Sequence, residues 1–463
     1  MIIKFEVENY LSFKDKAIFD LTAADITEFP DNVYESDDTG FLKSSILYGA
    51  NSSGKSNLFR AMLFFNELIQ YSQKQLDNDS IIPRITYLLD EKYYKKPTYM
   101  SITVLCEDDI IYEYSALFDN NHIIEEELNR FNDDTEEYDK VFKREDSEVH
   151  YEGFGNKKNN DMFSELVKSF LRRNSLFLSV LYSSNMQDPD VMRFFSEINE
   201  HRFLRVRSDF DMIMLGKPMR GRELHRTRAV ARRMENRKTT GDMAYIEKIN
   251  CIIKAADVDI VRIDSQKIKE LEDENVVRTR LVSEHKTINE NGEEKIVAFN
   301  TEEFESDGTK GLIGLAPDLV DIIDNNGVII FDEMDTSFHP LLTQMIVKLI
   351  NSKKSNKKGQ LIFSAHDISL IDNYSNIFRR DQIYFCEKIN SSSHIYSLYD
   401  IKGSNKKTIR KDENFARNYI RGKYKAIPIV KDIDEAFFET CKKNTENMSI
   451  FDYGDDDGKK EKI

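Results

Sequence analysis

Residues 46–56 read Ile-Leu-Tyr-Gly-Ala-Asn-Ser-Ser-Gly-Lys-Ser, a glycine-rich stretch that directly follows three apolar residues. From Gly49 to Ser56 it matches the phosphate-loop pattern G-x-x-x-x-G-K-[ST] at every fixed position. The apolar run predicts a buried parallel strand, and the apolar residues after Ser56 predict a helix. Backbone N–H groups at such a helix start converge on phosphate oxygens. The stretch therefore predicts an α/β fold with a nucleotide site.

The residues of this loop have separate expected tasks. In loops of this pattern the lysine, here Lys55, reaches the β- and γ-phosphates, and the hydroxyl that follows, here Ser56, is a ligand of Mg²⁺. The residues that we expect to contact the nucleotide are Gly49, Asn51, Ser52, Ser53, Gly54, Lys55, Ser56 and Asn57. Kinases, GTPases, helicases and ABC-type ATPases share this loop, so it indicates a ligand and leaves the function open.

Composition narrows the class of protein. The chain has 463 residues, with 66 basic and 82 acidic residues and a net charge of −16. This charge argues against a protein that coats nucleic acid non-specifically, and it leaves a local basic groove open. The four cysteines lie far apart without a C-x-x-C pair, as in reduced thiols. Because there is no signal-peptide pattern and no run near the ~18 apolar residues of a membrane span, we expect a cytoplasmic protein without a membrane partner.

Four regions differ in their patterns. Residues 1–125 predict an N-terminal lobe that is rich in strands and carries the phosphate loop. Residues 126–257 predict a charged surface excursion to about residue 160, followed by a helical insertion. Strand patterns return in 258–440, which predicts a C-terminal lobe. Residues 441–463 are mostly charged or polar and predict a disordered tail.

Two further apolar runs end in polar residues. Gly327–Phe331 is followed by Asp332 and Glu333, and Leu361–Ala365 is followed by His366. Such runs predict parallel strands with both faces covered, and ligands of these sheets bind at the carboxyl ends of the strands. We therefore expect Asp332 to hold Mg²⁺ through water and Glu333 to polarise the attacking water, while His366 contacts the γ-phosphate.

A second candidate anion site precedes these strands. Ser306, Asp307 and Gly308 open a predicted helix, and a helix start attracts anions. Taken alone, this is ordinary turn chemistry. Its place in the chain adds weight, because the order is phosphate loop, long insert, Ser-x-Gly helix start, Asp-Glu strand and histidine strand.

That order resembles the ABC-type ATPases of the SMC and RecF class, and Asn9–Phe13 is similar to their N-[FY]-x-S-F start. The chain is more similar still to the stand-alone bacterial "AAA family" ATPases of the RloA and AbiLi type, which are relatives of the ATPase half of OLD nucleases. The shared stretches are E-S-x-G-T, D-T-S-x-H-P-L-L, S-x-H, R-R-D-Q-I-Y-F-x-E-K and R-N-Y-x-x-G-K-Y-x-x-I-P. The resemblance covers residues 1–125 and about 258–430.

This resemblance implies an ABC-type P-loop ATPase with a β-rich N-terminal lobe, a mainly helical insertion, and ATP and Mg²⁺ as cofactors. Lys55 and Ser56 match the Walker A residues, Asp332 and Glu333 match the Walker B pair, and His366 matches the switch histidine. The catalytic residues would thus be Glu333 and His366.

The resemblance also carries expectations about partners. Residues 306–308 match the signature loop, which in ABC ATPases acts on nucleotide held by the other protomer, so a dimer or higher homo-oligomer is implied. The signature reads S-D-G-T where transporters have S-G-G-Q, and a Q-loop glutamine has no clear match. GTP is not supported, because the nearest N-K-x-D match, at Asn356–Gly359, has glycine in place of the aspartate.

Two functions remain open at this point. One is the sensor or regulatory subunit of an anti-phage, abortive-infection-like defence system that controls a separate effector encoded by a neighbouring gene. The alternative is a RecF- or SMC-like ATPase in DNA repair or recombination. The genes beside this one would discriminate the two, because a small toxin or nuclease gene favours the first and replication genes favour the second.

A basic run lies within the predicted insertion. Between Arg220 and Lys238 the chain has eight basic residues and only two acidic ones, Glu223 and Glu235. The helical period places Arg222, Arg226, Arg233 and Arg237 on one face. Three interpretations stay open: a solvated helix face, contacts with the phosphate backbone of a nucleic acid, or docking of an acidic effector protein.

Overall fold

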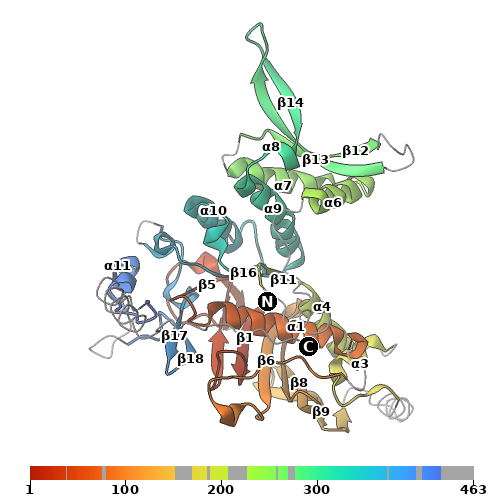
Figure 1. Cartoon of the computed structure of the whole chain (residues 1–463), viewed down its shortest axis with the longest axis vertical. Coiled ribbons are helices and arrows are strands. Elements are labelled where there is room, and N and C mark those ends of the chain that lie inside the picture. The colour runs from red at the N-terminus through yellow and green to blue at the C-terminus, as the bar shows by residue number, and fades with distance from the viewer. Residues whose placement is uncertain are drawn as a thin grey trace, which may run out of the picture. The chain divides into compact units, whose positions relative to one another are not determined.

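The structure is a computed structural model that forms two units, Met1–Ile427 and Pro428–Ile463. The described residues are 1–37, 39–75, 80–151, 169–184, 188–206, 227–256, 259–269, 277–372, 375–402 and 409–428. The predicted tail 441–463 and the first part of the basic run lie outside them. All further description concerns the first unit (Figure 1).

A six-stranded sheet carries the phosphate loop. Its order is β11 (His201–Leu204), β15 (Val328–Phe331), β16 (Gln360–Ser364), β5 (Ser44–Gly49), β17 (Ile383–Ile389) and β18 (Ser392–Ser397). The first five strands are parallel, and β18 runs antiparallel to β17. The strands predicted at 46–48, 327–331 and 361–365 are thus confirmed as three neighbours in one sheet.

Both faces of this sheet are covered, which explains the continuous apolar runs. Along β5, Leu47 points into one hydrophobic core, while Ile46 and Tyr48 point into another on the opposite face. The first core holds α1 (Lys55–Gln75), and the second holds α7 (Met243–Ala255), α9 (Asp307–Asn325) and α10 (Pro340–Asn351).

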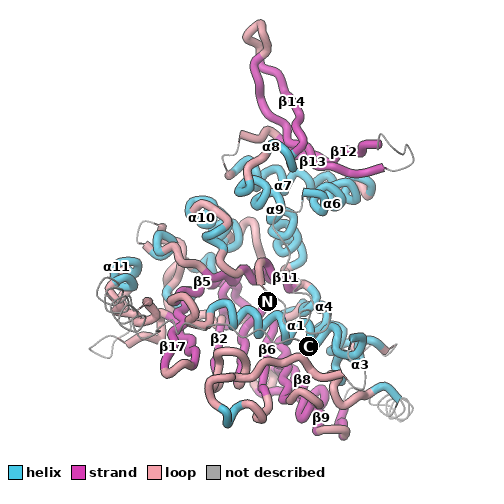
Figure 2. Tube along the Cα trace, viewed as in Figure 1, coloured by secondary structure: helices cyan, strands magenta, loops and turns pink. Residues whose placement is uncertain are grey.

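A second sheet packs against the other side of α1. It has seven antiparallel strands in the order β10-β9-β8-β7-β6-β1-β2, drawn in magenta in Figure 2. Phe65 of α1 lies 5.6 Å from the ring centroid of Tyr114 and 6.5 Å from that of Phe5. The bounds are β1 (Ile2–Glu8), β2 (Ala17–Asp20), β6 (Thr98–Leu105), β7 (Ile111–Phe118), β8 (Ile123–Asn132), β9 (Glu137–Glu145) and β10 (Glu148–Tyr151).

The charged stretch after residue 125 is a correction to the sequence analysis, because it forms strands and not a surface excursion up to residue 151. Leu128 and Phe142 are fully buried, and charged residues alternate with them on the outer face. Beneath them lies a buried ion pair between Arg144 and Glu126, whose carboxylate also accepts hydrogen bonds from Phe177 N and Leu178 N. A strand with one covered face has few apolar residues, so its composition resembles that of a loop.

The predicted helical insertion divides between two places. Helices α3 (Phe177–Ser183) and α4 (Pro189–Asn199) contact α1 and lead into β11, so this part belongs to the central sheet. Helices α6 (Thr227–Thr239) and α7 contact α9, and α6 also packs on the three-stranded sheet of β12 (Arg262–Lys269), β13 (Val277–Ile288) and β14 (Glu294–Asn300) (Figure 1). The domain boundaries at 125, 257 and 440 stay predictions.

The remaining elements are short. They are β3 (Val33–Ser36), β4 (Thr39–Leu42), α8 (Thr301–Phe304), α11 (Phe415–Ile420) and several 3₁₀ turns. Among the described residues, the helices all lack the length or the apolar content that crossing a membrane requires.

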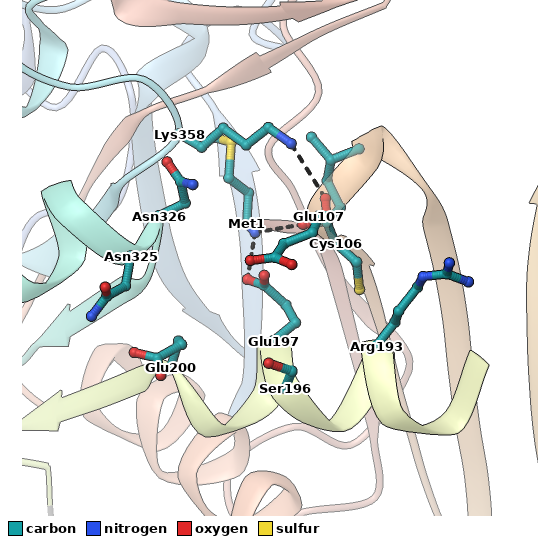
Figure 3. A pocket seen from close by; sticks show the side chains of 11 residues that line it. Met1, Cys106, Glu107, Arg193, Ser196, Glu197, Glu200, Asn325, Asn326 and Lys358 are labelled. Atoms are coloured by element: carbon teal, nitrogen blue, oxygen red, sulfur yellow. Dashed lines mark hydrogen bonds and ion pairs between the residues drawn. The ribbon is translucent and has the colours of Figure 1, made fainter. Parts of the chain in front are cut away.

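The amino group of Met1 joins β1 to α4 (Figure 3). It donates hydrogen bonds to Leu105 O at 2.8 Å and to the Glu197 carboxylate at 2.5 Å. Burial raises the pKa of Glu197, but the Met1 ammonium and His201 outweigh this effect, so the pKa lies below its ordinary value. A cavity of about 50 Å³ lies beside this pair.

Candidate nucleotide site

The phosphate loop spans the residues between β5 and α1, as the sequence predicts. Its glycines are required by close approaches. A Cβ at Gly49 would lie 2.4 Å from Cys386 O, and one at Gly54 would lie 2.3 Å from Ser393 Oγ. Gly54 also has φ +120°, which side chains rarely allow. The β5 strand and the neighbouring β17–β18 hairpin therefore press closely on the loop.

Lys55 begins α1 and folds back over the loop. Its Nζ donates to Gly49 O at 2.7 Å and to Ala50 O at 3.2 Å. Burial lowers the pKa of Lys55, while nearby acidic groups that include Asp332 and Glu333 act in the opposite direction. Among the described residues it makes no ion pair, so its charge meets only neutral carbonyl oxygens. Anionic phosphate oxygens are stronger partners for an ammonium than these carbonyls.

Ser53 gives an independent indication that the loop fits a phosphate. Its hydroxyl oxygen is buried and has no hydrogen-bond partner in the part of the chain that is described. Its carbonyl is engaged, because Ser393 Oγ donates to Ser53 O at 2.5 Å and Cys386 Sγ donates at 3.2 Å. An unsatisfied buried hydroxyl costs free energy, and a phosphate oxygen at the loop would satisfy it.

Asp332 and Glu333 follow β15 and are tied to the next strand through one serine. Ser364 Oγ of β16 donates to Asp332 Oδ1 at 2.6 Å and accepts from Glu333 N at 2.8 Å. Glu333 has φ 52°, in the left-handed region, so its backbone is strained. Strain of this kind persists where the surroundings hold it, and here Ser364 holds both acidic residues.

The turn after Glu333 fixes the end of β16. Asp335 Oδ2 accepts from His366 N at 2.7 Å and from Asp367 N at 2.8 Å. From the end of β11, Arg205 donates to Thr336 and Ser337 in the same turn. The ends of three neighbouring strands are thus linked through this turn, and His366 is exposed beside it.

One cavity of about 450 Å³ lies above these strand ends, within the size range of ligand sites. It brings together most of the predicted loop residues with both predicted catalytic residues. Its lining consists of Asn51, Ser52, Ser53, Gly54, Lys55, Ser56, Asn57, Glu333, His366 and Lys388. Gly49 and Asp332 are buried and do not line it.

Lys388 was not among the predicted site residues. It lies at the end of β17, whose Cys386 is paired with Gly49 of β5. Lys388 is the last residue of the R-R-D-Q-I-Y-F-x-E-K stretch, and the signal that could have indicated it was its position at the end of an apolar strand.

The residues present fit a magnesium ion of the expected kind. Among the described residues, no three His, Cys, Asp or Glu side chains form a group that could hold a metal. Mg²⁺ usually keeps several waters and binds one or two protein groups together with substrate phosphates. Ser56, in the first turn of α1, would be the direct protein ligand and Asp332 would hold the ion through water, with phosphate oxygens and further waters supplying the rest.

The predicted signature residues lie elsewhere. Ser306 is the N-cap of α9, and its Oγ accepts from Thr309 N at 3.2 Å. Ser306, Asp307 and Gly308 are exposed, and none of them lines the phosphate-loop cavity. Gly308 instead lines a second cavity of about 480 Å³ that includes Phe338. Within one chain, the structure does not bring the signature residues to the nucleotide site.

The N-terminal stretch 9–13 supports the loop from the side. Ser12 Oγ accepts from Asn57 Nδ2 and from Ser393 Oγ, each at 2.8 Å. Asn9 Nδ2 donates to the carbonyls of Tyr93, Lys96 and Pro97. Sequence analysis used this stretch only for its resemblance, whereas the structure gives Ser12 a contact with α1.

The basic run is partly described. Arg220, Arg222 and Arg226 lie outside the described residues. In α6, Arg233 binds Asp318 at 2.9 Å and Asp321 at 3.3 Å, and Arg237 binds Asp242 at 2.8 Å. The described arginines of the predicted face thus pair with acidic groups of the same chain. Arg228 and Arg232 are exposed.

A protein-family model described as "AAA domain, putative AbiEii toxin, Type IV TA system" matches residues 44–372. The chain belongs to this family. The match spans the phosphate loop, Asp332–Glu333 and His366. No curated protein matches the chain.

The solved structures that the chain matches include two SMC head domains and a RecF protein. The SMC head domain from Thermotoga maritima is 11% identical, with 86% of this chain and 98% of that chain covered and a TM-score of 0.36. The Smc head domain with a coiled coil and joint from Pyrococcus yayanosii is 12% identical, with 92% and 99% covered and a TM-score of 0.39. The recombination mediator protein RecF is 13% identical, with 85% and 98% covered and a TM-score of 0.35. At these identities and TM-scores, the similarity does not indicate a function.

The expected α/β class is confirmed, with the phosphate loop in the matched AAA domain, and the ABC-type ATPase fold stays a prediction. The narrower resemblance to the RloA and AbiLi type stays a prediction, as do the roles of the individual site residues.

Proposed function

We propose that this protein hydrolyses ATP to ADP and phosphate with Mg²⁺, and that it serves as the regulatory ATPase of an anti-phage, abortive-infection-like system with a separate effector protein. The observation that carries the enzymatic part is one cavity that contains Lys55, Ser56, Glu333 and His366. These residues follow the two neighbouring strands β15 and β16 and begin the helix after β5, and they supply a phosphate clamp and a carboxylate.

The proposed chemistry divides among the residues of this cavity. Lys55 and the loop N–H groups hold the β- and γ-phosphates. Glu333 takes a proton from the water that attacks the γ-phosphorus, and the strained backbone at Glu333 fixes where its carboxylate can point. His366 contacts the γ-phosphate. When bound, Mg²⁺ neutralises phosphate charge in the transition state, and Ser56 and Asp332 would hold it.

The proposed role in anti-phage defence is supported by the description of the protein family. The description of the family names an AbiEii toxin and a Type IV TA system, and this wording supports a role in defence. We propose that this chain supplies the ATPase and that a neighbouring gene supplies the effector. Co-purification of the tagged chain, followed by mass spectrometry, would identify such a partner. Recovery of replication or recombination proteins would instead support the repair alternative.

Glu333→Gln tests the catalytic assignment. We expect turnover to fall by roughly several hundred-fold while ATP binding is retained, because glutamine keeps the shape and loses the basicity. Phosphate release and equilibrium binding of ATP are the measurements. Glu148→Gln, at an exposed position of β10, is the matched control and should leave both unchanged. Near-normal phosphate release by the Glu333→Gln protein would refute the assignment.

A further inference from the structure

Lys388 is held at the edge of the nucleotide cavity by two strand pairings. On one side, β17 pairs with β5 so that Cys386 lies opposite Gly49, the first residue of the phosphate loop. On the other side, Lys388 lies opposite Ser393 of β18. Its Cα position is therefore determined by the register with β18, two residues beyond the last pairing of β17 with β5.

The contacts of Ser393 show where the Lys388 side chain points. Ser393 Oγ donates to Ser53 O in the phosphate loop, and residues directly opposite in an antiparallel pair project to the same face. Lys388 accordingly lines the cavity together with Lys55 and Glu333. The hairpin thus supports the loop through Ser393 and presents an ammonium beside it through Lys388.

The charges of the cavity favour an anion near Lys388. Among the described residues, Lys388 has no ion pair or hydrogen bond through its ammonium, and the residue is exposed. The cavity is lined by two lysines and a single carboxylate, that of Glu333. Lysines placed around one cavity repel each other, and this repulsion is relieved when a polyanion binds between them.

The order of the strands indicates which part of the nucleotide Lys388 meets. Glu333 and His366 follow β15 and β16, on one side of β5, whereas Lys388 lies at the end of β17, on the other side. In the proposed function the γ-phosphate lies on the Glu333 side. The phosphate chain then crosses the loop toward β17, and its α-phosphate end faces Lys388.

We propose that Lys388 is a nucleotide-binding residue that contacts the α-phosphate end of ATP. This inference rests on the proposed function. Because ATP and ADP share this end, Lys388 would bind both nucleotides equally and would contribute nothing specific to the transition state. Loss of such uniform binding raises KM and leaves kcat unchanged.

The test compares Lys388→Gln with Lys295→Gln, a matched change at an exposed lysine of β14. We expect Lys388→Gln to raise the Kd of ATP, the Kd of ADP and the KM of ATP by about tenfold each, as for the loss of one charge-assisted hydrogen bond. We expect kcat to change less than about twofold. Lys388→Arg, which keeps the cation, should restore most of the affinity, and thermal unfolding should show that all variants are folded.

The other possible results would contradict either the role of Lys388 or the proposed function. Unchanged binding of both nucleotides by Lys388→Gln would overturn this inference alone, and so would a loss confined to ATP, which would place the ammonium at the γ-phosphate. A fall in kcat with unchanged affinity would also overturn it. Wild-type protein that fails to bind ATP would overturn the proposed function itself.

Discussion

Lys43 is a buried ammonium one residue before β5, the strand that carries the phosphate loop. Only 1% of the residue is exposed, and its Nζ donates to Asn356 O at 3.1 Å. Burial lowers its pKa to about 8, with a further contribution from Lys353, while Asp31 acts in the opposite direction. In the unfolded chain the pKa of Lys43 is about 10.4, so Lys43 loses its proton at a lower pH in the folded protein than in the unfolded chain.

This shift predicts how stability depends on pH. Between about pH 8 and the unfolded pKa, the unfolded chain binds more protons at Lys43 than the folded chain, so the free energy of unfolding rises with pH in this window. Below pH 8 Lys43 is protonated in both states, and the whole free-energy cost of burying its charge lowers the stability of the fold. At about 1.4 kcal/mol per pKa unit, the rise amounts to a few kcal/mol. Chemical denaturation of wild type and Lys43→Met from pH 7.5 to 10.5 measures it, and parallel pH profiles would contradict it.

At the scale of elements, α6 and α9 are joined by neighbouring charges. Arg233 on α6 binds Asp318 and Asp321 on α9, and Asp318 is only 6% exposed. The next residue toward the N-terminus, Arg232, is exposed and makes no ion pair among the described residues. Two adjacent arginines of the basic run thus differ in whether they stabilise the fold.

The two arginines provide a matched experiment. We expect Arg233→Ala to lower the free energy of unfolding by about 1–3 kcal/mol, because it removes the charge-assisted hydrogen bonds of Arg233 to Asp318 and Asp321. Arg232→Ala should change it by less than ~0.5 kcal/mol. If the run binds a polyanion, the double change Arg228→Glu and Arg232→Glu should weaken that binding and its dependence on salt. Equal stability of the two alanine variants, measured by denaturation, would contradict the structural role of Arg233.

At the scale of the whole molecule, the separation between the signature residues and the phosphate-loop cavity predicts sites shared by two protomers. Ser306 begins α9 and is exposed, as a group facing a neighbour would be. Homodimers of Lys55→Ala and of Ser306→Arg should both be inactive. After random exchange in an equal mixture, half of the dimers have one intact site of two, so about a quarter of wild-type activity should return.

Phosphate release measures this recovery, and differently tagged chains confirm that protomers have exchanged. Strictly cooperative sites would lower the recovery, so the mixture is compared with mixtures of each variant and wild type. Activity of Ser306→Arg alone, at any protein concentration, would exclude the shared site.

The sequence by itself determined the phosphate loop and the strand ends that lie beside it. The loop needs glycine at Gly54, where φ is positive, and at Gly49, where Cys386 O approaches closely, so the loop can be recognised from the sequence. Strands covered on both faces are continuous apolar runs, so β5, β15 and β16 were predictable. Because parallel strands present their carboxyl ends at one edge, Lys55, Glu333 and His366 could be expected together before the structure placed them in one cavity.

Only the tertiary structure decided what depends on contacts between distant residues. The strands β8–β10 are covered on one face only, and their outer face carries many charged residues. The alternation that is typical of strands was therefore not recognised in the sequence. The place of β11 beside β15, inside a predicted insertion, depends on a pairing across more than a hundred residues. Arg233 pairs with residues of α9, and Lys388 lies by the loop through sheet register. Local patterns record which face of an element is apolar, and they do not record which partner covers it.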